Sequence, residues 1–569
     1  MLAASDTFFR SETLIYSATA ITFLVAALLL LLIFRHTFRR RLRGPETGSA
    51  GRLGIVKTFA LDQRRQLVVI RRDDKEHLVM IGGSNDLAIE SDIISKGGRD
   101  PYQLAKNWPR EEEPKELGIA PVRPLLKLAE TIFTGPGLFP LAVLSGIAGA
   151  GAGLLCGLFR VALEAADRLR ISLPVVWRGE PLVGCSLLIA GAAAAATFSA
   201  WLVRRFCEHA AGSGIPHVEA VISGELPPAP LILLPVKFVG GLLAIGAGFA
   251  LGREGPSVQM GANFAHLLGK AFGRNSADCR SLLAAGAGAG LAATFNAPLA
   301  GAAFVLEELT RQFETRNAIA ALGASGSAIV VARLFTGPAP DFAVTIVAYP
   351  AASDNLLCLA LGVAAGLLGV AYNRLLLGTL AITDRLARWP VEIRAAIVGA
   401  AVGALAWFAP GLAGGGDALT QRTLDGTEAL ALLPLIYMLR LVLGAVSYAA
   451  GTPGGLFAPL LVLGAQMGFF FGGLIDPGAA DPASHAIAFA VVGMAALFTA
   501  VVRAPLTGII LVTEMTATPS LLLPMMAACF PAMAVATMLR EPPIYDSLKE
   551  RTLALWRKKA GLISANRTE

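Results

Sequence analysis

A glycine-rich stretch in the middle of the chain, Gly252-Arg253-Glu254-Gly255-Pro256, places a carboxylate between two long apolar runs. An ionisable group at membrane depth is expensive, and such groups usually mark an ion or proton pathway. The glycines let the backbone approach a ligand, and Pro256 suits the first turn of a helix. We therefore expect a helix to begin here, with free N–H groups directed at an anion and Glu254 at the same place. The alternative is a helix break whose Arg–Glu pair reaches the lipid headgroups.

Two other breaks interrupt apolar runs, at Gly212-Ser213-Gly214-Ile215-Pro216 and Gly454-Gly455-Leu456-Phe457-Ala458-Pro459. Each supplies helix-terminal N–H groups or a hydroxyl, and neither adds a carboxylate. Donors without acceptors select an anion, through electrostatics that strengthen away from water. Ser213 and Tyr545 can add hydroxyl donors, and neutral donors suit a transported ion because a full cationic clamp would hold it too tightly. The three breaks together predict an anion pathway.

The composition is that of a polytopic membrane protein, with 55% hydrophobic residues, 16% charged residues and a mean hydropathy of +0.62. The 61 glycines and 33 prolines are many for simple spanning helices, which favours broken and re-entrant helices. The net charge of +7 fits cytoplasmic loops, and we expect no nucleic-acid partner. The six cysteines show no metal-ligand spacing, so we expect no metal and no cofactor.

The first 118 residues differ in composition from the rest. Residues 13–34 are uncharged and arginines follow them, which predicts a signal-anchor helix and basic stop over residues 1–50. Short β-rich runs predict a small cytoplasmic β-domain over 51–95, and the polar residues 96–118 predict a linker. The helix, basic stop and strands resemble the flagellar-biosynthesis protein O family; a generic β-domain is the alternative. We expect no flagellar role, because most of the chain is something else.

A hydrophobic body follows over residues 119–548, and the basic tail, residues 549–569, is expected at the cytoplasmic surface. The body contains a gapless repeat, in which the run from Gly286 (GAGAGLAATFNAPLAGAAFVLEE) recurs 207 residues later from Gly493 (GMAALFTAVVRAPLTGIILVTEM). Upstream, Pro256 corresponds to Pro459 with a shift of 203 residues. The body therefore consists of two related halves, about 119–330 and 331–548. Transporters built in this way place their sites at the repeat interface.

The breaks GSGIP, GREGP and GGLFAP, with a tyrosine after the last apolar segment (PPIYDSL), resemble in order the motifs of the CLC family of chloride channels and proton-coupled chloride transporters. The resemblance implies an all-helical membrane fold with an inverted repeat, and a homodimer with a separate pore in each subunit. It implies that Ser213 and Tyr545 give hydroxyls, and Leu456 and Phe457 give amides, to a central chloride. It further implies an external anion site at the amides of Arg253 to Gly255, with Glu254 as the gating and external proton glutamate.

The adjacent acids Glu307 and Glu308 bear on whether protons are coupled. Neighbouring helical residues point about 100° apart, so the two carboxylates have different surroundings. Glu307 has a repeat partner, Glu514, which favours a shared structural role, whereas Met515 stands opposite Glu308. The resemblance places Glu308 at the internal proton-transfer position; the alternative is a cytoplasm-facing surface acid. Elsewhere in the body, apolar surroundings predict that Glu219 and Lys237 form a buried ion pair.

The sequence thus predicts a chloride/proton antiporter of the bacterial inner membrane, not an enzyme. Its partners are chloride, protons and the lipid bilayer, with an unknown protein partner possible for the β-domain. A serine in GSGIP matches the chloride-preferring pattern of the family. Two alternatives remain open: a passive chloride channel of the same fold, and a scaffold component of a membrane export apparatus.

Overall fold

The computed structural model describes residues 53–60, 66–72, 75–81, 87–94, 137–344, 354–386, 388–475 and 482–565. The chain divides into two compact units, Met1–Val122 and Arg123–Glu569, and each is described by itself. The signal-anchor helix and basic stop predicted over residues 1–50 and the linker predicted over 96–118 lie outside the described residues.

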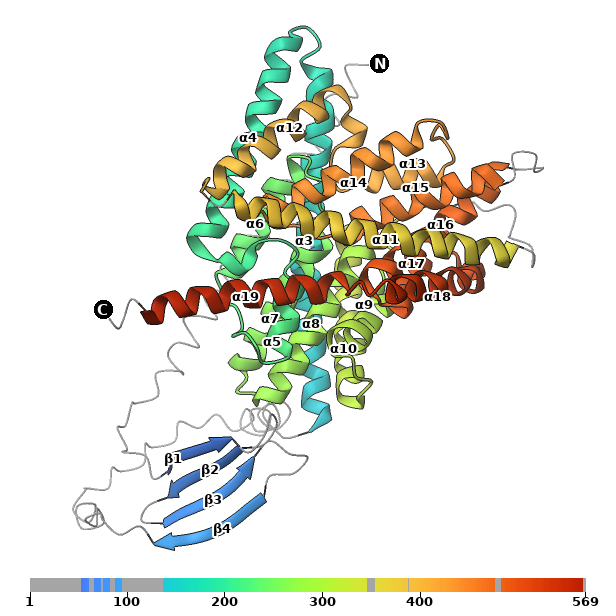
Figure 1. Ribbon diagram of the computed structural model, residues 1–569. Coiled ribbons are helices and arrows are strands. Elements are labelled where there is room, and N and C mark those ends of the chain that lie inside the picture. The colour runs from blue at the N-terminus through green and yellow to red at the C-terminus, as the bar shows by residue number, and fades with distance from the viewer. Residues whose placement is uncertain are drawn as a thin grey trace, which may run out of the picture. The chain divides into compact units, whose positions relative to one another are not determined.

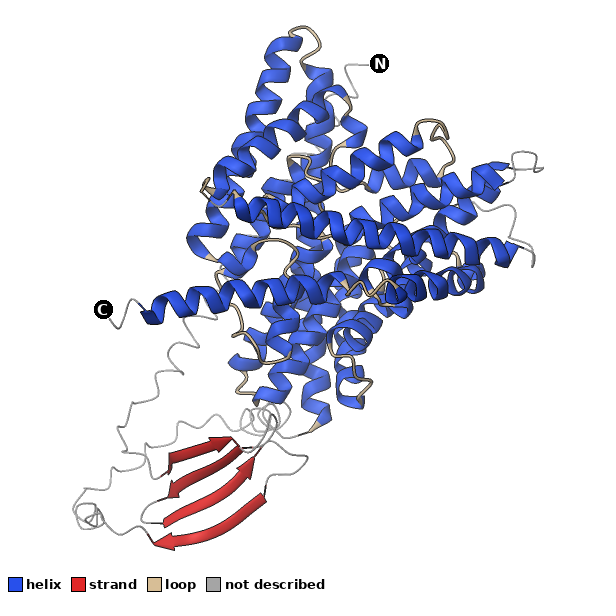
Figure 2. Ribbon diagram, viewed as in Figure 1, coloured by secondary structure: helices blue, strands red, loops and turns tan. Residues whose placement is uncertain are grey.

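The first unit contains a four-stranded antiparallel sheet with strand order β1-β2-β3-β4 (Figures 1 and 2). Its strands are Leu53–Ala60, Gln66–Arg72, Lys75–Ile81 and Leu87–Ile94. Each strand falls on one of the β-rich runs of the sequence, and each pairs with its neighbour in the chain. Short polar turns between such runs favour this up-and-down order.

Helices joined by loops make up the described residues of the second unit (Figure 2). Its first half contains α3 (Leu138–Val176), α4 (Pro181–Phe206), α5 (Ile215–Ile222), α6 (Leu233–Gly246), α7 (Glu254–Ala271), α8 (Ser276–Phe295), α9 (Pro298–Phe304) and α10 (Thr315–Thr336). Its second half contains α11 (Asp354–Arg385), α12 (Val391–Phe408), α13 (Asp417–Leu424), α14 (Leu433–Ala449), α15 (Phe457–Ile475), α16 (Pro482–Val502), α17 (Pro505–Thr516), α18 (Leu522–Met538) and α19 (Ile544–Ala565). Among the described residues, 8 helices are long and apolar enough to cross a membrane.

The two halves repeat one another in backbone detail. Helix α7 begins at Glu254 and α15 begins 203 residues later at Phe457. The turns from α8 into α9 and from α16 into α17 each contain a left-handed residue, Asn296 (φ 51°) and Arg503 (φ 71°), separated by the 207-residue shift of the sequence repeat. Non-glycine residues seldom adopt this conformation, so its recurrence at matched positions reflects one turn geometry used twice.

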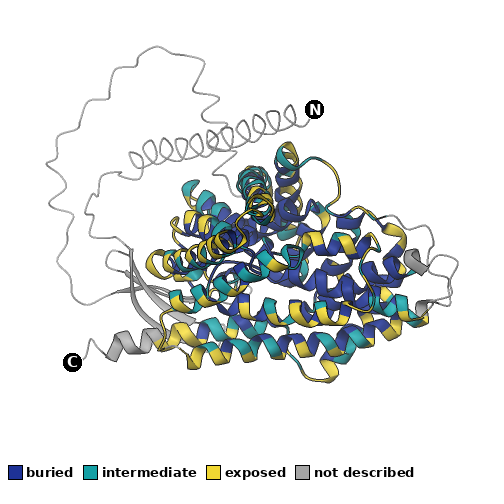
Figure 3. Cartoon of the chain, turned by 90° about the horizontal axis from the view of Figure 1, so that it is seen from above, coloured by how far each residue is buried: buried dark blue, intermediate teal, exposed yellow. Residues whose placement is uncertain are grey.

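The core lies where α7 packs on α8 and α15 packs on α16, and Figure 3 shows the most buried ribbon in the interior of the helical unit. Glycines permit both approaches: a Cβ on Gly261 would lie 2.3 Å from the Gly286 oxygen, and one on Gly464 would lie 2.6 Å from the Gly493 oxygen. These pairs are related by the repeat. Close packing of helices through small residues is typical of membrane proteins, where lipid supplies no hydrophobic drive for association.

Candidate functional site

The three glycine–proline breaks meet at one place in the second unit. The Gly212 amide donates to the Thr452 carbonyl at 3.0 Å, and the Gly454 amide donates to the Gly212 carbonyl at 3.1 Å. Gly252 and Gly455 exchange two further backbone hydrogen bonds, of 2.9 and 2.7 Å. Segments from both halves are thereby joined, and α5, α7 and α15 all begin beside this junction. The sequence-based prediction of separate helix starts is confirmed, and the structure adds their convergence.

Glu254 is the first residue of α7 and is fully buried. Its Oε1 accepts a hydrogen bond of 2.6 Å from the backbone amide of Phe457, the first residue of α15. Its Oε2 is buried and has no hydrogen-bond partner among the described residues. A helix N-terminus is a natural position for an anion, so the carboxylate occupies a place that an inorganic anion could take. This burial does not fit a side chain that reaches the lipid headgroups.

Glycine is required opposite this carboxylate. A Cβ on Gly455 would lie 2.1 Å from Glu254 Oε1, and one on Gly252 would lie 1.9 Å from Glu254 Oε2. Both positions would therefore clash with the buried side chain. The glycines of the GREGP and GGLFAP breaks make the space in which the acid meets the amide of Phe457.

Ser213 and Tyr545 bring two hydroxyl groups to the same region. Both residues are fully buried, and the Phe457 and Tyr545 rings have their centroids 5.8 Å apart. The Ser213 and Tyr545 hydroxyls lie near one another, but among the described residues neither makes a well-formed hydrogen bond. Buried hydroxyls normally have partners, so this pair can donate to an additional acceptor. Leu456, also fully buried, precedes Phe457 at the start of α15.

Arg253 directs its charge away from the buried acid. Its guanidinium forms ion pairs of 3.2 Å with Asp341 and 3.2 Å with Asp417. Asp341 also pairs with Arg160 at 2.7 Å. The contribution of Arg253 to an anion site therefore comes from its backbone, since two carboxylates already neutralise the side chain.

The predicted ion pair between Glu219 and Lys237 is wrong. Lys237 is fully buried, and its Nζ donates to the carbonyls of Ala210 at 3.0 Å and Gly212 at 2.7 Å. It thereby satisfies one carbonyl just before the GSGIP break and one in its first residue. Composition alone could not distinguish a carboxylate partner from carbonyl partners, because both need only a buried acceptor.

Glu307 and its repeat partner Glu514 form a reciprocal pair of helix caps. Glu307 accepts from the amides of Leu506 and Thr507 at 3.0 and 2.6 Å, at the first turn of α17. Glu514 accepts from the amides of Leu299 and Ala300 at 3.1 and 2.8 Å, at the first turn of α9. Each half therefore caps the matching helix of the other, as expected for a shared structural role.

Glu308, by contrast, lies in a π-helical turn, Val305–Leu309, with only 4% of its side chain exposed. This burial does not fit the alternative of a surface acid. Glu308 borders a cleft of about 470 Å³ that Glu219 also lines. Helix α5 has 8 residues, so Ser213 precedes one end and Glu219 lies near the other. The sequence reasoning missed Glu219 here, although the short distance from Ser213 was a usable signal.

The helical membrane body consists of two related halves, and helix N-termini from both halves converge on a buried carboxylate. This arrangement defines a protein with an anion pathway. The family model described as "Voltage gated chloride channel" matches residues 191–537. The chain therefore belongs to the voltage-gated chloride channel (CLC) family.

Relatives and solved structures agree with this assignment. The chain is 38% identical to the H(+)/Cl(-) exchange transporter ClcA of Citrobacter koseri, over 73% of this chain and 89% of the relative. The protein of the same name from Vibrio parahaemolyticus is also 38% identical, over 73% of this chain and 90% of the relative. The structure of a slow cyanobacterial Cl-/H+ antiporter matches with 33% identity and a TM-score of 0.69, covering 73% of this chain and 98% of the other. A eukaryotic CLC transporter shares the fold, with a TM-score of 0.62 at 23% identity and coverages of 75% and 74%.

Proposed function

We propose that this protein exchanges chloride for protons across the membrane, with Glu254 and Glu308 as its two proton-carrying groups. The proposal is supported by the named activities of its relatives, which are H(+)/Cl(-) exchange transporters and a Cl-/H+ antiporter. These are transport activities and not enzymatic ones. Helices long enough to span a bilayer support a multi-pass membrane location.

The observation that carries the mechanism is the hydrogen bond from the Phe457 amide to Glu254. A charged carboxylate and a chloride ion compete for the same N–H donors. Protonation removes the negative charge from Glu254 and weakens its hold on the amide, because charge-assisted hydrogen bonds are the stronger ones. Chloride binding at the start of α15 is then linked to proton binding at Glu254, and the linkage acts in both directions.

Chloride would be held by the hydroxyls of Ser213 and Tyr545 and the amides of Leu456 and Phe457. The amides of Arg253 to Gly255 would hold a second chloride on the outer side. These groups are neutral donors, and such a site can bind an anion and also release it. Glu308 would exchange protons with the cytoplasm through the cleft beside it.

All three breaks are joined by hydrogen bonds inside the second unit, so the groups assigned here to chloride binding come from one chain. This is consistent with a homodimer in which each subunit transports independently. We further propose the inner membrane of a bacterium as the location, with the β-domain and C-terminal tail in the cytoplasm. Neither the channel nor the scaffold alternative needs two separately buried glutamates on the ion route.

The deciding experiment reconstitutes the purified protein in liposomes with a chloride gradient as the only driving force. We expect protons to move uphill as chloride flows. Glu254→Ala is expected to abolish proton movement while chloride continues to pass, because the competing carboxylate is gone. Glu308→Gln is expected to do the same, because the inner proton carrier is lost.

Glu550→Gln is the matched control, since it neutralises an exposed acid on α19. It should couple like the unaltered protein. Chloride flux without proton movement in the unaltered protein would establish a channel. Absence of any anion flux from a folded, reconstituted protein would instead favour the scaffold.

A further inference from the structure

The cleft beside Glu308 has walls from several elements that are distant in the sequence. Its charged lining residues come from α5, α8, the segment that leads into α10, and α19. They are Glu219 of α5; Arg280 of α8; Glu308, Arg311 and Glu314 before α10; Arg316 in the first turn of α10; and Asp546 and Lys549 of α19. Glu307 is adjacent to Glu308 in the chain but its carboxylate is bound at α17. The cleft therefore brings acids and bases together at the inner end of α5.

Two of these carboxylates are almost wholly buried. Glu219 and Glu308 have exposed fractions of 5% and 4%. In each, Oε1 has no hydrogen-bond partner among the described residues. Two neighbouring buried carboxylates resist being charged together, so a nearby cation strongly influences whether Glu308 keeps its proton.

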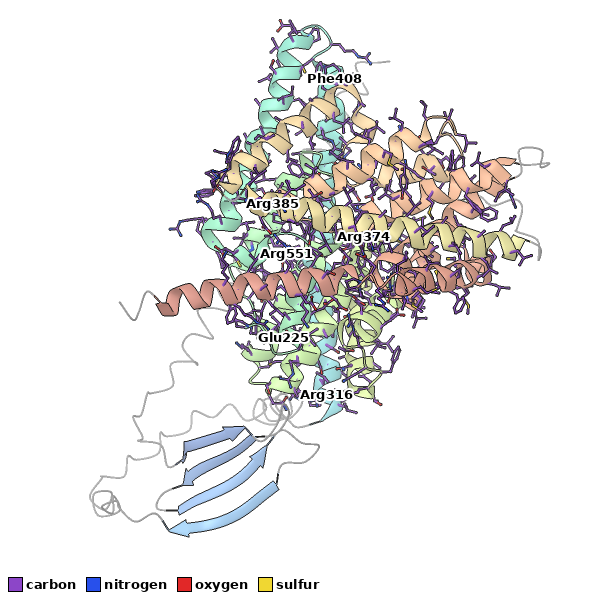
Figure 4. All side chains as sticks on the ribbon, in the orientation of Figure 1. Glu225, Arg316, Arg374, Arg385, Phe408 and Arg551 are labelled. Carbon is purple, nitrogen blue, oxygen red and sulfur yellow. The ribbon has the colours of Figure 1, made fainter. Side chains whose placement is uncertain are left out.

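Arg311 is the cation that Glu308 shares with another acid. Its Nη2 lies 3.9 Å from Glu308 Oε1 and 2.6 Å from Asp546 Oδ1. The other bases of the cleft differ in position. Lys549 pairs with Glu225, Arg316 pairs with Asp278, and Arg280 is exposed (Figure 4 labels Glu225 and Arg316).

The backbone of Arg311 adopts an unusual conformation for its residue type. It has a φ of 51°, a left-handed conformation that non-glycine residues adopt only at a cost. Its partner Asp546 directly follows Tyr545 in the first turn of α19. The shared guanidinium therefore connects the buried proton site with the helix end that carries an anion-site hydroxyl.

We propose that Arg311 is a positioning residue for proton exchange at Glu308, and that Asp546 tunes it by competing for the same guanidinium. This inference rests on the proposed antiport function. When Glu308 is charged, it attracts Arg311 away from Asp546; when Glu308 is protonated, Arg311 returns to Asp546. Loss of a proton at Glu308 thus breaks the ion pair of Asp546 at the start of α19, beside Tyr545.

Neutralising Arg311 and neutralising Asp546 should have opposite effects on proton transport. In Arg311→Gln, Glu308 loses its nearby cation and holds its proton to higher pH. In Asp546→Asn, Arg311 is released toward Glu308 and a repelling charge disappears, so Glu308 gives up its proton at lower pH. We expect the pH profile of proton transport to move up by about 1 pH unit in the first variant and down by about 1 in the second.

The measurement is the ratio of proton flux to chloride flux in liposomes, taken from about pH 5 to about pH 9, the range over which a perturbed buried carboxyl titrates. Arg551→Gln and Asp384→Asn are the matched controls, because they neutralise an ion pair between α19 and α11 whose residues do not line the cleft. Both control profiles should superimpose on the unaltered one.

Opposite shifts with unchanged controls would support the inference. If the unaltered protein pumps protons, shifts of the two variants in the same direction, or no shift in either, would overturn the inference. A purely structural ion pair would be broken equally by either change. An unaltered protein that carries chloride without protons would overturn the proposed function and this inference together. Arg311→Ala serves as a second variant, since the side chain is 52% exposed and its truncation leaves no buried cavity.

Discussion

Lys237 is a buried lysine whose partners are backbone carbonyls instead of a carboxylate. Its ammonium group donates to Ala210 and Gly212, and the Gly212 carbonyl also accepts from Gly454. The side chain thus supports the joint between the GSGIP and GGLFAP breaks. Two hydrogen bonds from one buried side chain suit a joint that must stay fixed while ions pass.

Replacing Lys237 with methionine should destabilise the protein. The change keeps the length of the side chain but leaves the Ala210 carbonyl without its lysine donor and removes one of the two donors to Gly212. We expect a loss of about 1–3 kcal/mol in stability, offset in part because a buried polar group is also removed. The measurement is the thermal midpoint of the detergent-solubilised protein.

Lys270→Met is the control, because Lys270 is exposed at the end of α7. It should leave the midpoint unchanged. An equally unchanged midpoint in Lys237→Met would contradict a supporting role for the ammonium group at the joint.

At the scale of elements, the reciprocal caps bind each half to the other. Glu307→Gln and Glu514→Gln should each lower stability by about 0.5–2 kcal/mol, the range for loss of a charged helix cap. Glu307 also accepts from the Thr507 hydroxyl at 2.7 Å, so its loss should be the larger. Thermal midpoints of the two single variants and the double variant measure both effects.

A measurement of proton coupling distinguishes the structural role of Glu307 as a helix cap from a role in proton transfer. Glu307→Gln should transport protons and chloride in the unaltered ratio at a temperature where it is folded, whereas the neighbouring Glu308→Gln should not. Loss of coupling in both variants would show that Glu307 also carries protons and would contradict its assignment as a cap alone.

Sequence patterns predicted where helices begin better than they predicted which residues meet in the tertiary fold. Glycine and proline mark the starts of α5, α7 and α15, and the repeat predicted the shared role of Glu307 and Glu514, because these signals are local or periodic. The pairs Lys237–Gly212 and Arg311–Asp546 were not foreseen. Asp546 and Arg311 are 235 residues apart, and only the tertiary fold brings them together.

At the scale of the molecule, the proposed anion site belongs to neither half alone. Helices α5 and α7 come from the first half, α15 comes from the second, and Tyr545 lies beyond the last long apolar helix. Backbone hydrogen bonds and reciprocal caps join the halves around it. A repeat interface of this kind can hold a buried acid at a fixed place while the ion pathway remains continuous across both halves.

Deletion of residues 1–118 should leave coupled transport within about twofold of the full chain. The contacts described for the proposed anion and proton sites lie between Gly212 and Asp546, and the family match spans residues 191–537. The comparison is chloride and proton flux per reconstituted protein, with the amount in the liposomes quantified for both forms. Thermal midpoints of the two forms provide the control, since a loss of flux that accompanies a lower midpoint reflects stability. A folded truncated protein that carries chloride but no longer moves protons would contradict the prediction. It would place part of the coupling in the segment that precedes the helical unit.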